Sequence, residues 1–234
     1  MLASLFFVGG CKQLHSSGYQ QIGKSSGNFG FHCILGETDS DDYDRILHIN
    51  GFAVAYDPQS TRLDSFNLVI NNLSVSQNTE SHELNYVAGK KYTLDIKTAY
   101  GEATGSITAP SISGIQFVNL PDTHYTNKPL VIKWKYPTGE SNNGGIIVSA
   151  NNYISNILSP ETTEYNIPVT ALKNMTGSIQ ITVTSVRFVK FPKLINPNDD
   201  FYVFIDGLDW TVGTYFGVFY SINRYVRFLK SNQP

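Results

Sequence analysis

Stretches in which apolar and polar side chains alternate every two residues recur along this chain of 234 residues. Residues 92–98 alternate between one parity that carries Tyr92, Leu94, Ile96 and Thr98 and another that carries Thr93, Asp95 and Lys97. Residues 130–136 repeat the pattern around Ile132 and Trp134. Because successive side chains of a β-strand point to opposite faces of the sheet, this period predicts half-buried strands. The expected fold class is all-β.

A proline marks the expected boundary between two domains. Residues 109–114, Ala-Pro-Ser-Ile-Ser-Gly, follow one alternating stretch and precede the next. Proline cannot donate a ladder hydrogen bond, so it often stands where strands end. We therefore expect two tandem antiparallel β-sandwich domains, at residues 29–109 and 110–234, the second with an aromatic-rich C-terminal extension.

Three local features refine this expectation. Asn50-Gly51 and residues 99–101 are typical of tight turns between strands. The parity of the apolar residues slips after Val183, which predicts a bulge near Thr184 and Ser185. Residues 221–230 fit either a short amphipathic helix capped by Ser221 or a terminal strand.

The N-terminus combines an apolar block with a small-residue pair and a cysteine. Residues 2–8 are apolar, Gly9 and Gly10 precede Cys11, and residues 12–28 are rich in Ser, Gly and Gln. The stretch 8–11 resembles the lipobox of bacterial lipoproteins. That resemblance implies cleavage before Cys11, a diacylglycerol on its thiol, a signal-peptide remnant at residues 1–10 and a flexible tether at 11–28. The alternative is an ordinary first strand, and the absence of Lys or Arg before the apolar block leaves the true start of the chain open.

The second half resembles a fibronectin type III module. The likeness covers residues 110–190 and rests on the proline-led entry, on Trp134 in an early strand, and on the pair of stretches 164–172 and 178–186. It departs from the family where a tyrosine is expected near Ser178. The resemblance implies a β-sandwich, and the first half is interpreted as a related immunoglobulin-like unit.

Composition and motifs argue against several classes of function. A net charge of −2 and a pI near 6.2 provide no cationic surface for nucleic acid. The histidines are scattered and no catalytic glycine motif is present, so neither a metal nor a cofactor is expected. The acidic residues of 37–44 are interpreted as a solvated loop rather than a calcium site. Cys33 alternates with apolar neighbours and is interpreted as a buried thiol.

Aromatic residues concentrate near the C-terminus. Within 213–221 they occupy both strand parities, Tyr215 and Phe219 on one and Phe216 and Tyr220 on the other. One parity can enter the core, and the other must meet another part of the chain, a partner protein or a sugar. The preceding loop is the candidate ligand contact, through Tyr202, Asp206, Asp209 and Trp210.

Together these features predict a non-catalytic, lipid-anchored protein of the cell envelope that acts in adhesion, scaffolding or assembly. The expected partners are the membrane, through the acyl chains on Cys11, and an envelope protein. A carbohydrate-binding lipoprotein is the first alternative, and a β-sandwich hydrolase with two converging carboxylates is the second.

Overall fold

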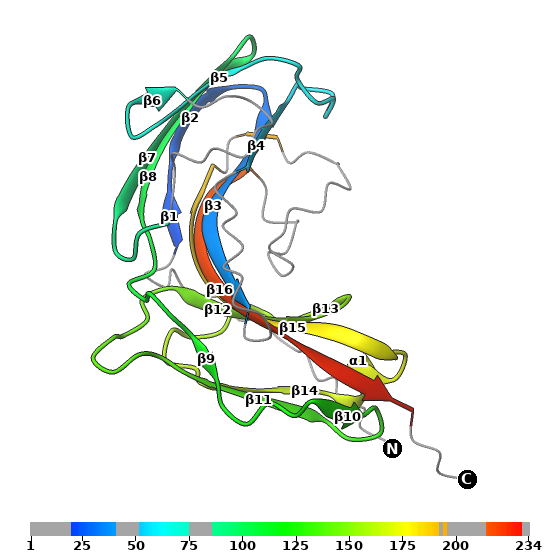
Figure 1. The fold of residues 1–234 in the computed structure, drawn as a ribbon. Coiled ribbons are helices and arrows are strands. Elements are labelled where there is room, and N and C mark those ends of the chain that lie inside the picture. The colour runs from blue at the N-terminus through cyan, green and yellow to red at the C-terminus, as the bar shows by residue number, and fades with distance from the viewer. Residues whose placement is uncertain (1–19, 41–51, 75–85, 192–193, 196–213, 231–234) are drawn as a thin grey trace, which may run out of the picture.

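The computed structural model describes residues 20–40, 52–74, 86–191, 194–195 and 214–230 (Figure 1). Within these ranges the regular elements are strands and one short helix, α1 (Val169–Leu172), joined by turns and loops. This confirms the all-β class.

The strands form one large sheet and two small ones. The large sheet runs in the order β13 (Tyr153–Ile154), β12 (Gly145–Ala150), β15 (Gly177–Lys190), β16 (Tyr215–Leu229), β3 (Gly30–Ser40) and β4 (Phe52–Tyr56), with β1 (Gln20–Ile22) beside β15 and β10 (Thr123–Tyr125) beside β16. The five-stranded sheet has the order β2 (Lys24–Gly27), β8 (Gly101–Thr108), β7 (Lys91–Thr98), β5 (Asn67–Ile70) and β6 (Leu73–Ser74). The three-stranded sheet has the order β14 (Glu164–Ile167), β11 (Leu130–Lys135) and β9 (Gln116–Phe117).

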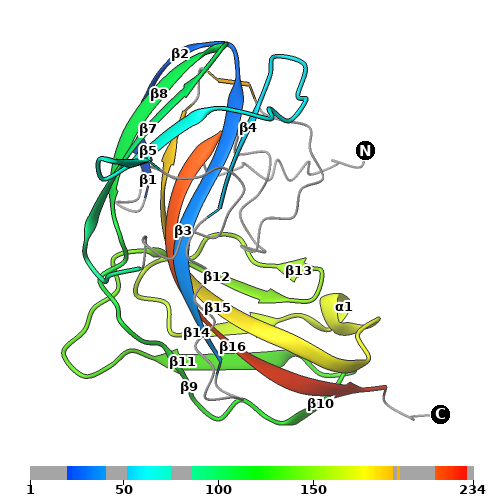
Figure 2. The same cartoon turned by 45° about the horizontal axis from the view of Figure 1, so that its top comes forward.

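Both small sheets pack on the same face of the large one, called here the inner face. The five-stranded sheet covers the end that contains β3 and β4, and the three-stranded sheet covers the end that contains β12 and β10 (Figures 1 and 2). These two ends are called the β3 end and the β10 end. The molecule is therefore two sandwiches that share one curved sheet.

β15 and β16 pass through both sandwiches. Their antiparallel ladder is continuous from Gly177 opposite Phe228 to Lys190 opposite Tyr215. The C-terminal strands therefore complete the sandwich that holds β3, and the predicted extents 29–109 and 110–234 do not coincide with the sheets. The bulge predicted near Thr184 and Ser185 is wrong, because the register is unbroken there and residues on both parities are buried.

The large sheet is mixed rather than purely antiparallel. β16 pairs in parallel with β3 and with β10, and β1 pairs in parallel with β15. Residues 221–230, for which helix and strand were both open, continue β16 as far as Leu229.

Residues 20–27, which were predicted to belong to the tether, form two short edge strands. β1 pairs with β15 of the large sheet, and β2 pairs with β8 of the five-stranded sheet, so this segment closes one side of the sandwich. Between them, a Cβ on Gly23 would meet the ring of Phe191 at 2.0 Å. Only glycine allows that ring to lie against the crossing point.

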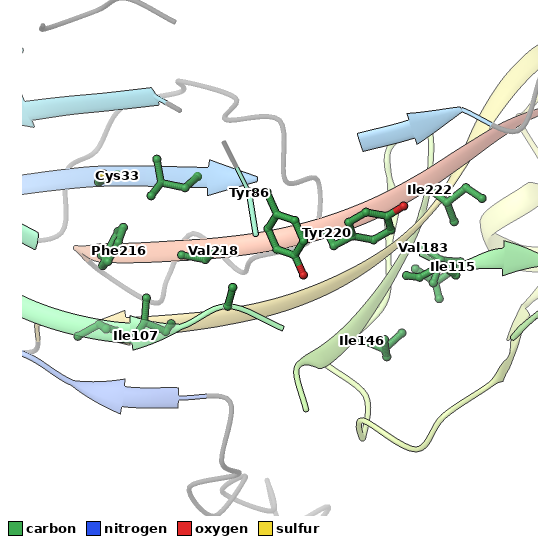
Figure 3. Close-up of a cluster of buried hydrophobic side chains, with 14 of the residues drawn as sticks. Cys33, Tyr86, Ile107, Ile115, Ile146, Val183, Phe216, Val218, Tyr220 and Ile222 are labelled. Carbon is green, nitrogen blue, oxygen red and sulfur yellow. The ribbon is translucent and has the colours of Figure 1, made fainter. Parts of the chain in front are cut away.

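The core follows the inner face of the large sheet without interruption. Figure 3 shows Cys33, Ile107, Phe216 and Val218 at one end and Ile115, Ile146, Val183 and Ile222 at the other, with Tyr86 and Tyr220 between them. The predicted alternation in β7 and β11 is confirmed, because apolar residues of both strands are buried and the intervening ones are exposed. Cys33 is a free, buried thiol, as interpreted from its neighbours.

Candidate functional site

Polar side chains gather where the two sandwiches meet, at a group called here the junction cluster: Glu37, Asp39, Tyr86, Glu140 and Tyr220. The register of β3 and β16 sets Glu37 opposite Tyr220 and Asp39 opposite Ile222, on the inner face. Tyr86 lies ahead of β7, and its ring centroid is 5.5 Å from that of Tyr220. The cluster is thus assembled from distant parts of the chain.

The two tyrosines are hydrogen-bond donors. The hydroxyl of Tyr220 donates to Oδ2 of Asp39. The hydroxyl of Tyr86 shares its one hydrogen between the carbonyl oxygens of Pro110 and Ile112, each 2.7 Å away. These bonds hold Tyr86 against residues 109–114, called here the linker, which connect one sandwich to the next.

Burial keeps both phenols in their neutral form. It is the main cause that raises the pKa of Tyr86, and Tyr92, Glu37 and Glu140 raise it further. Burial also raises the pKa of Tyr220 most, followed by the hydrogen bond and the charge of Asp39. A neutral phenol in a low-dielectric site is a donor and a poor base or nucleophile.

The linker is also held by the loop between β11 and β12. The backbone N–H of Ser113 donates to Oε2 of Glu140 at 2.8 Å, and that of Ser111 donates to Oδ1 of Asn143 at 2.8 Å. The loop is itself fixed by Asn142, whose Oδ1 accepts from the Ser185 hydroxyl at 2.6 Å. The polar residues of this loop therefore connect the linker to β15.

The polar groups of the junction cluster form hydrogen bonds that hold parts of the protein together. Asp39 accepts from Tyr220 and Glu140 accepts from Ser113, so these two carboxylates bind protein groups. In the part of the chain that the structure describes, no three His, Cys, Asp or Glu side chains are placed to hold a metal ion. Over the same residues, no helix has the length and apolar character needed to cross a membrane.

The opposite, outer face of the large sheet differs between its two ends. At the β3 end it is buried: His32 lies 5.0 Å from the ring of Tyr215 and 5.8 Å from that of Tyr56, and Tyr215 is only 2% exposed. Phe219 lies against Gly36 on the same face, where a Cβ would meet its ring at 2.4 Å. The sequence left open what the second aromatic parity of residues 213–221 meets. In the structure both aromatic parities of this part of β16 are buried.

At the β10 end the outer face is buried over β12, where Ile147 and Ser149 are 1% and 5% exposed, and it is exposed over β10, β13 and the end of β16. Tyr225 and Tyr125 are 44% and 51% exposed, and the Tyr225 hydroxyl donates to Oε1 of Gln180 at 3.3 Å. By register, the residues that share this surface with them include Ile154 and Arg227. These five residues (Tyr125, Ile154, Gln180, Tyr225 and Arg227) are called here the tyrosine face. It combines apolar rings with an amide and a guanidinium, a composition suited to macromolecular contacts.

The site residues predicted from the sequence lie outside the described residues. This applies to Cys11 and to the loop residues Tyr202, Asp206, Asp209 and Trp210. They stay predictions.

Sequence reasoning missed the junction cluster and the tyrosine face. Asp39 and Glu140 carry no local motif, and their partners lie 181 and 27 positions away along the chain. Tyr225 falls within residues 221–230, for which the sequence left helix and strand open. A signal was present in residues 223–227, where Asn223, Arg224 and Arg227 follow the apolar and aromatic first part of the strand.

No family model matches the chain, and no curated protein matches it. Among solved structures it is similar to one described as "Structures of Clostridium thermocellum CbhA fibronectin(III)-like modules", with 11% sequence identity, coverage of 86% of this chain and 95% of that chain, and a TM-score of 0.28. A likeness at this TM-score carries no argument about fold or function.

Proposed function

We propose that the chain is a non-catalytic, lipid-anchored protein of the cell envelope, and that it contacts a protein partner through the tyrosine face. The lipobox-like stretch 8–11 is the basis for the anchor, and the observation that carries the partner contact is the contrast along the outer face of β16. Phe219 is buried there, whereas Tyr225, on the same strand and the same face, is 44% exposed. Exposed tyrosines beside an arginine are enriched at protein interfaces.

The junction cluster supports a role without chemistry. Its tyrosines are neutral donors, and Asp39 and Glu140 bind protein groups. Such a cluster keeps two sandwiches in a constant relative position, which suits a scaffold that presents a surface.

Lipid anchoring is tested by metabolic labelling in a bacterial host. The wild-type chain, expressed with a full signal peptide, is expected to incorporate labelled palmitate, and Cys11→Ser is expected to incorporate none. Equal labelling of the two proteins, or none in either, would remove the anchor from the proposal.

Partner binding is tested by placing a photo-crosslinking amino acid at single positions in the native host. A discrete crosslinked species is expected from position 225. Position 100 is the matched control, because Tyr100 is similarly exposed, at 42%, but lies at the hairpin between β7 and β8. Crosslinks of equal yield and size from both positions, or from neither, would contradict the proposal.

A carbohydrate is the second candidate ligand of the same surface. Tyrosine rings stack on the apolar faces of sugars, and Gln180 and Arg227 supply polar groups beside them. Binding on a glycan array that is lost in Tyr225→Ala and kept in Tyr100→Ala would favour the carbohydrate over the protein partner.

A further inference from the structure

Among the described strands, the first long one, β3, lies beside the last, β16. β3 and β16 pair in parallel over nine registered positions, from His32 opposite Tyr215 to Ser40 opposite Asn223. In sequence the partners are 183 residues apart. This ladder therefore joins the two ends of the described chain directly.

Parallel pairing decides how this ladder would respond to tension. The chain enters β3 at Gly30, at the end of the sheet where β16 begins, and it leaves β16 at Leu229, at the opposite end. A force applied between the N-terminal and C-terminal ends of the chain pulls β3 and β16 along their axes in opposite directions. The evenly spaced hydrogen bonds of a parallel ladder are then loaded together rather than one after another.

Side chains reinforce this ladder on both of its faces. On the outer face, Oγ1 of Thr38 and Oγ of Ser221 form a buried hydrogen bond of 2.8 Å. On the inner face, Tyr220 donates to Asp39. At the start of the ladder, the backbone N–H of Phe31 donates to Oγ1 of Thr214 at 3.3 Å. Each of these bonds crosses between the segments that the force would slide apart.

The strands before β3 offer less resistance. β1 has three registered pairs with β15, and β2 has four with β8. Both run toward the end of the sheet at which β3 begins, so tension on the N-terminus opens them from their first residue, one rung at a time. The load then reaches Gly30, where β3 is held by β16 on one side and by β4 on the other.

We propose that the β3–β16 ladder is a mechanical clamp that bears tension applied between the two ends of this chain. The proposal rests on the proposed function for the source of the load, namely a lipid anchor on the N-terminal side and a bound partner elsewhere. The clamp itself is a property of the fold. It would let the protein transmit a pull without losing either sandwich.

Single-molecule force spectroscopy on the full chain tests the clamp by changing the direction of pulling. In the first geometry the handles are attached at the two termini. In the second, one handle stays at the N-terminus and the other is attached to Gln59→Cys, in the exposed turn after β4. Both proteins carry Cys11→Ser, and Cys33 is buried and does not compete for the handle.

The two geometries predict different forces for the same fold. The second pulls apart the paired ends of β3 and β4, at Gly30 and Tyr56, so their ladder opens rung by rung. We expect the main rupture force to be severalfold higher between the termini, after a weaker early event from β1 and β2. Equal forces in the two geometries would overturn the proposal.

A side-chain variant locates the resistance within the molecule. Thr38→Val removes the hydroxyl that bonds Ser221, and Thr38→Ser retains it. Faster forced unfolding is expected for Thr38→Val between the termini and not in the second geometry, because rupture under load reports the barrier for that path. Ile132→Val, in the distant β11, controls for lost stability alone. If Ile132→Val accelerates rupture as much as Thr38→Val does, the clamp is not at β3–β16.

The force measurements test the clamp whether or not the chain is lipid-anchored. Loss of palmitate labelling would remove the proposed source of the load and leave the measured clamp intact. Equal forces in the two geometries would remove the clamp and leave the anchor intact.

Discussion

Phe219 and Tyr225 lie on the same strand, on the same face and six positions apart, yet one is buried and the other is 44% exposed. The β3 end of the large sheet is buried on both faces, whereas at the β10 end the last part of β16 is buried only on its inner face. One strand thus supplies core on both sides in its first part and core on one side in its second. Aromatic content alone therefore does not identify a binding surface, because most aromatic residues described in β16 are buried in the protein.

The largest effect is expected from truncating an aromatic residue at the covered end. Phe219→Ala should lower the free energy of unfolding by about 3–5 kcal/mol, because it leaves a cavity above Gly36. Tyr225→Ala should cost less than about 1 kcal/mol, as surface substitutions do. Urea denaturation of both variants measures the difference, and equal losses would break the comparison.

A smaller effect is expected from adding volume at the same place. Gly36→Ala introduces a Cβ that would meet the Phe219 ring at 2.4 Å, so it should destabilise the protein by about 1–3 kcal/mol. In combination with Phe219→Leu, part of this loss should be recovered, because the two sites are in contact. Strictly additive losses in a double-mutant cycle would show that the ring does not lie against Gly36.

The next effect concerns the junction between the two ends. Glu140→Ala removes the acceptor of the Ser113 N–H and should cost about 1 kcal/mol, less than a buried bond to a carboxylate because this one is exposed to solvent. Limited proteolysis should then cut faster between Thr108 and Gly114. Glu164→Ala is the matched control, since Glu164 pairs with Lys133 on the exposed side of β11. Equal cleavage of the two variants would mean that Glu140 does not hold the linker.

The last effect is absent near neutral pH, and we expect it only in alkaline solution. Burial raises the pKa of Tyr86 and of Tyr220 in the folded state, so above a pH of about 10 the unfolded state loses phenolic protons that the folded state keeps. Their contribution to stability is complete below that pH and is lost as the pH rises above it. Denaturation midpoints between pH 8 and pH 11, about one to two units either side of the phenol value, should fall, and Tyr86→Phe should reduce the slope.

A constant midpoint across that range would contradict the neutral state assigned to these phenols.

The strands with one solvated face were predictable, and their alternation shows why. In β7 and β11 each exposed position carries a polar residue, apart from Val131, because water selects one face and the core selects the other. β15 lacks this contrast: residues 183–186 are all buried, so the change of parity that indicated a bulge has no structural counterpart. A pattern of burial on both faces contains no information about register.

Pairing between distant strands was not predictable from local sequence. Nothing in residues 30–40 indicates a parallel partner at 215–229, and the junction cluster depends on that pairing. The segment 20–27 was assigned to a tether because an edge strand exposed to water can be as polar as a linker. Lys24, Ser25 and Ser26 suit such an edge, since they discourage pairing with other molecules.

The separation of 183 residues between Thr38 and Ser221 also orders the events of folding. β3 is synthesised early, but its partner β16 emerges only after all the other described strands. Contacts of such high sequence separation form slowly, because a long loop must close before any of them is made. The sheet that unites both sandwiches can therefore be completed only after β16 has been synthesised.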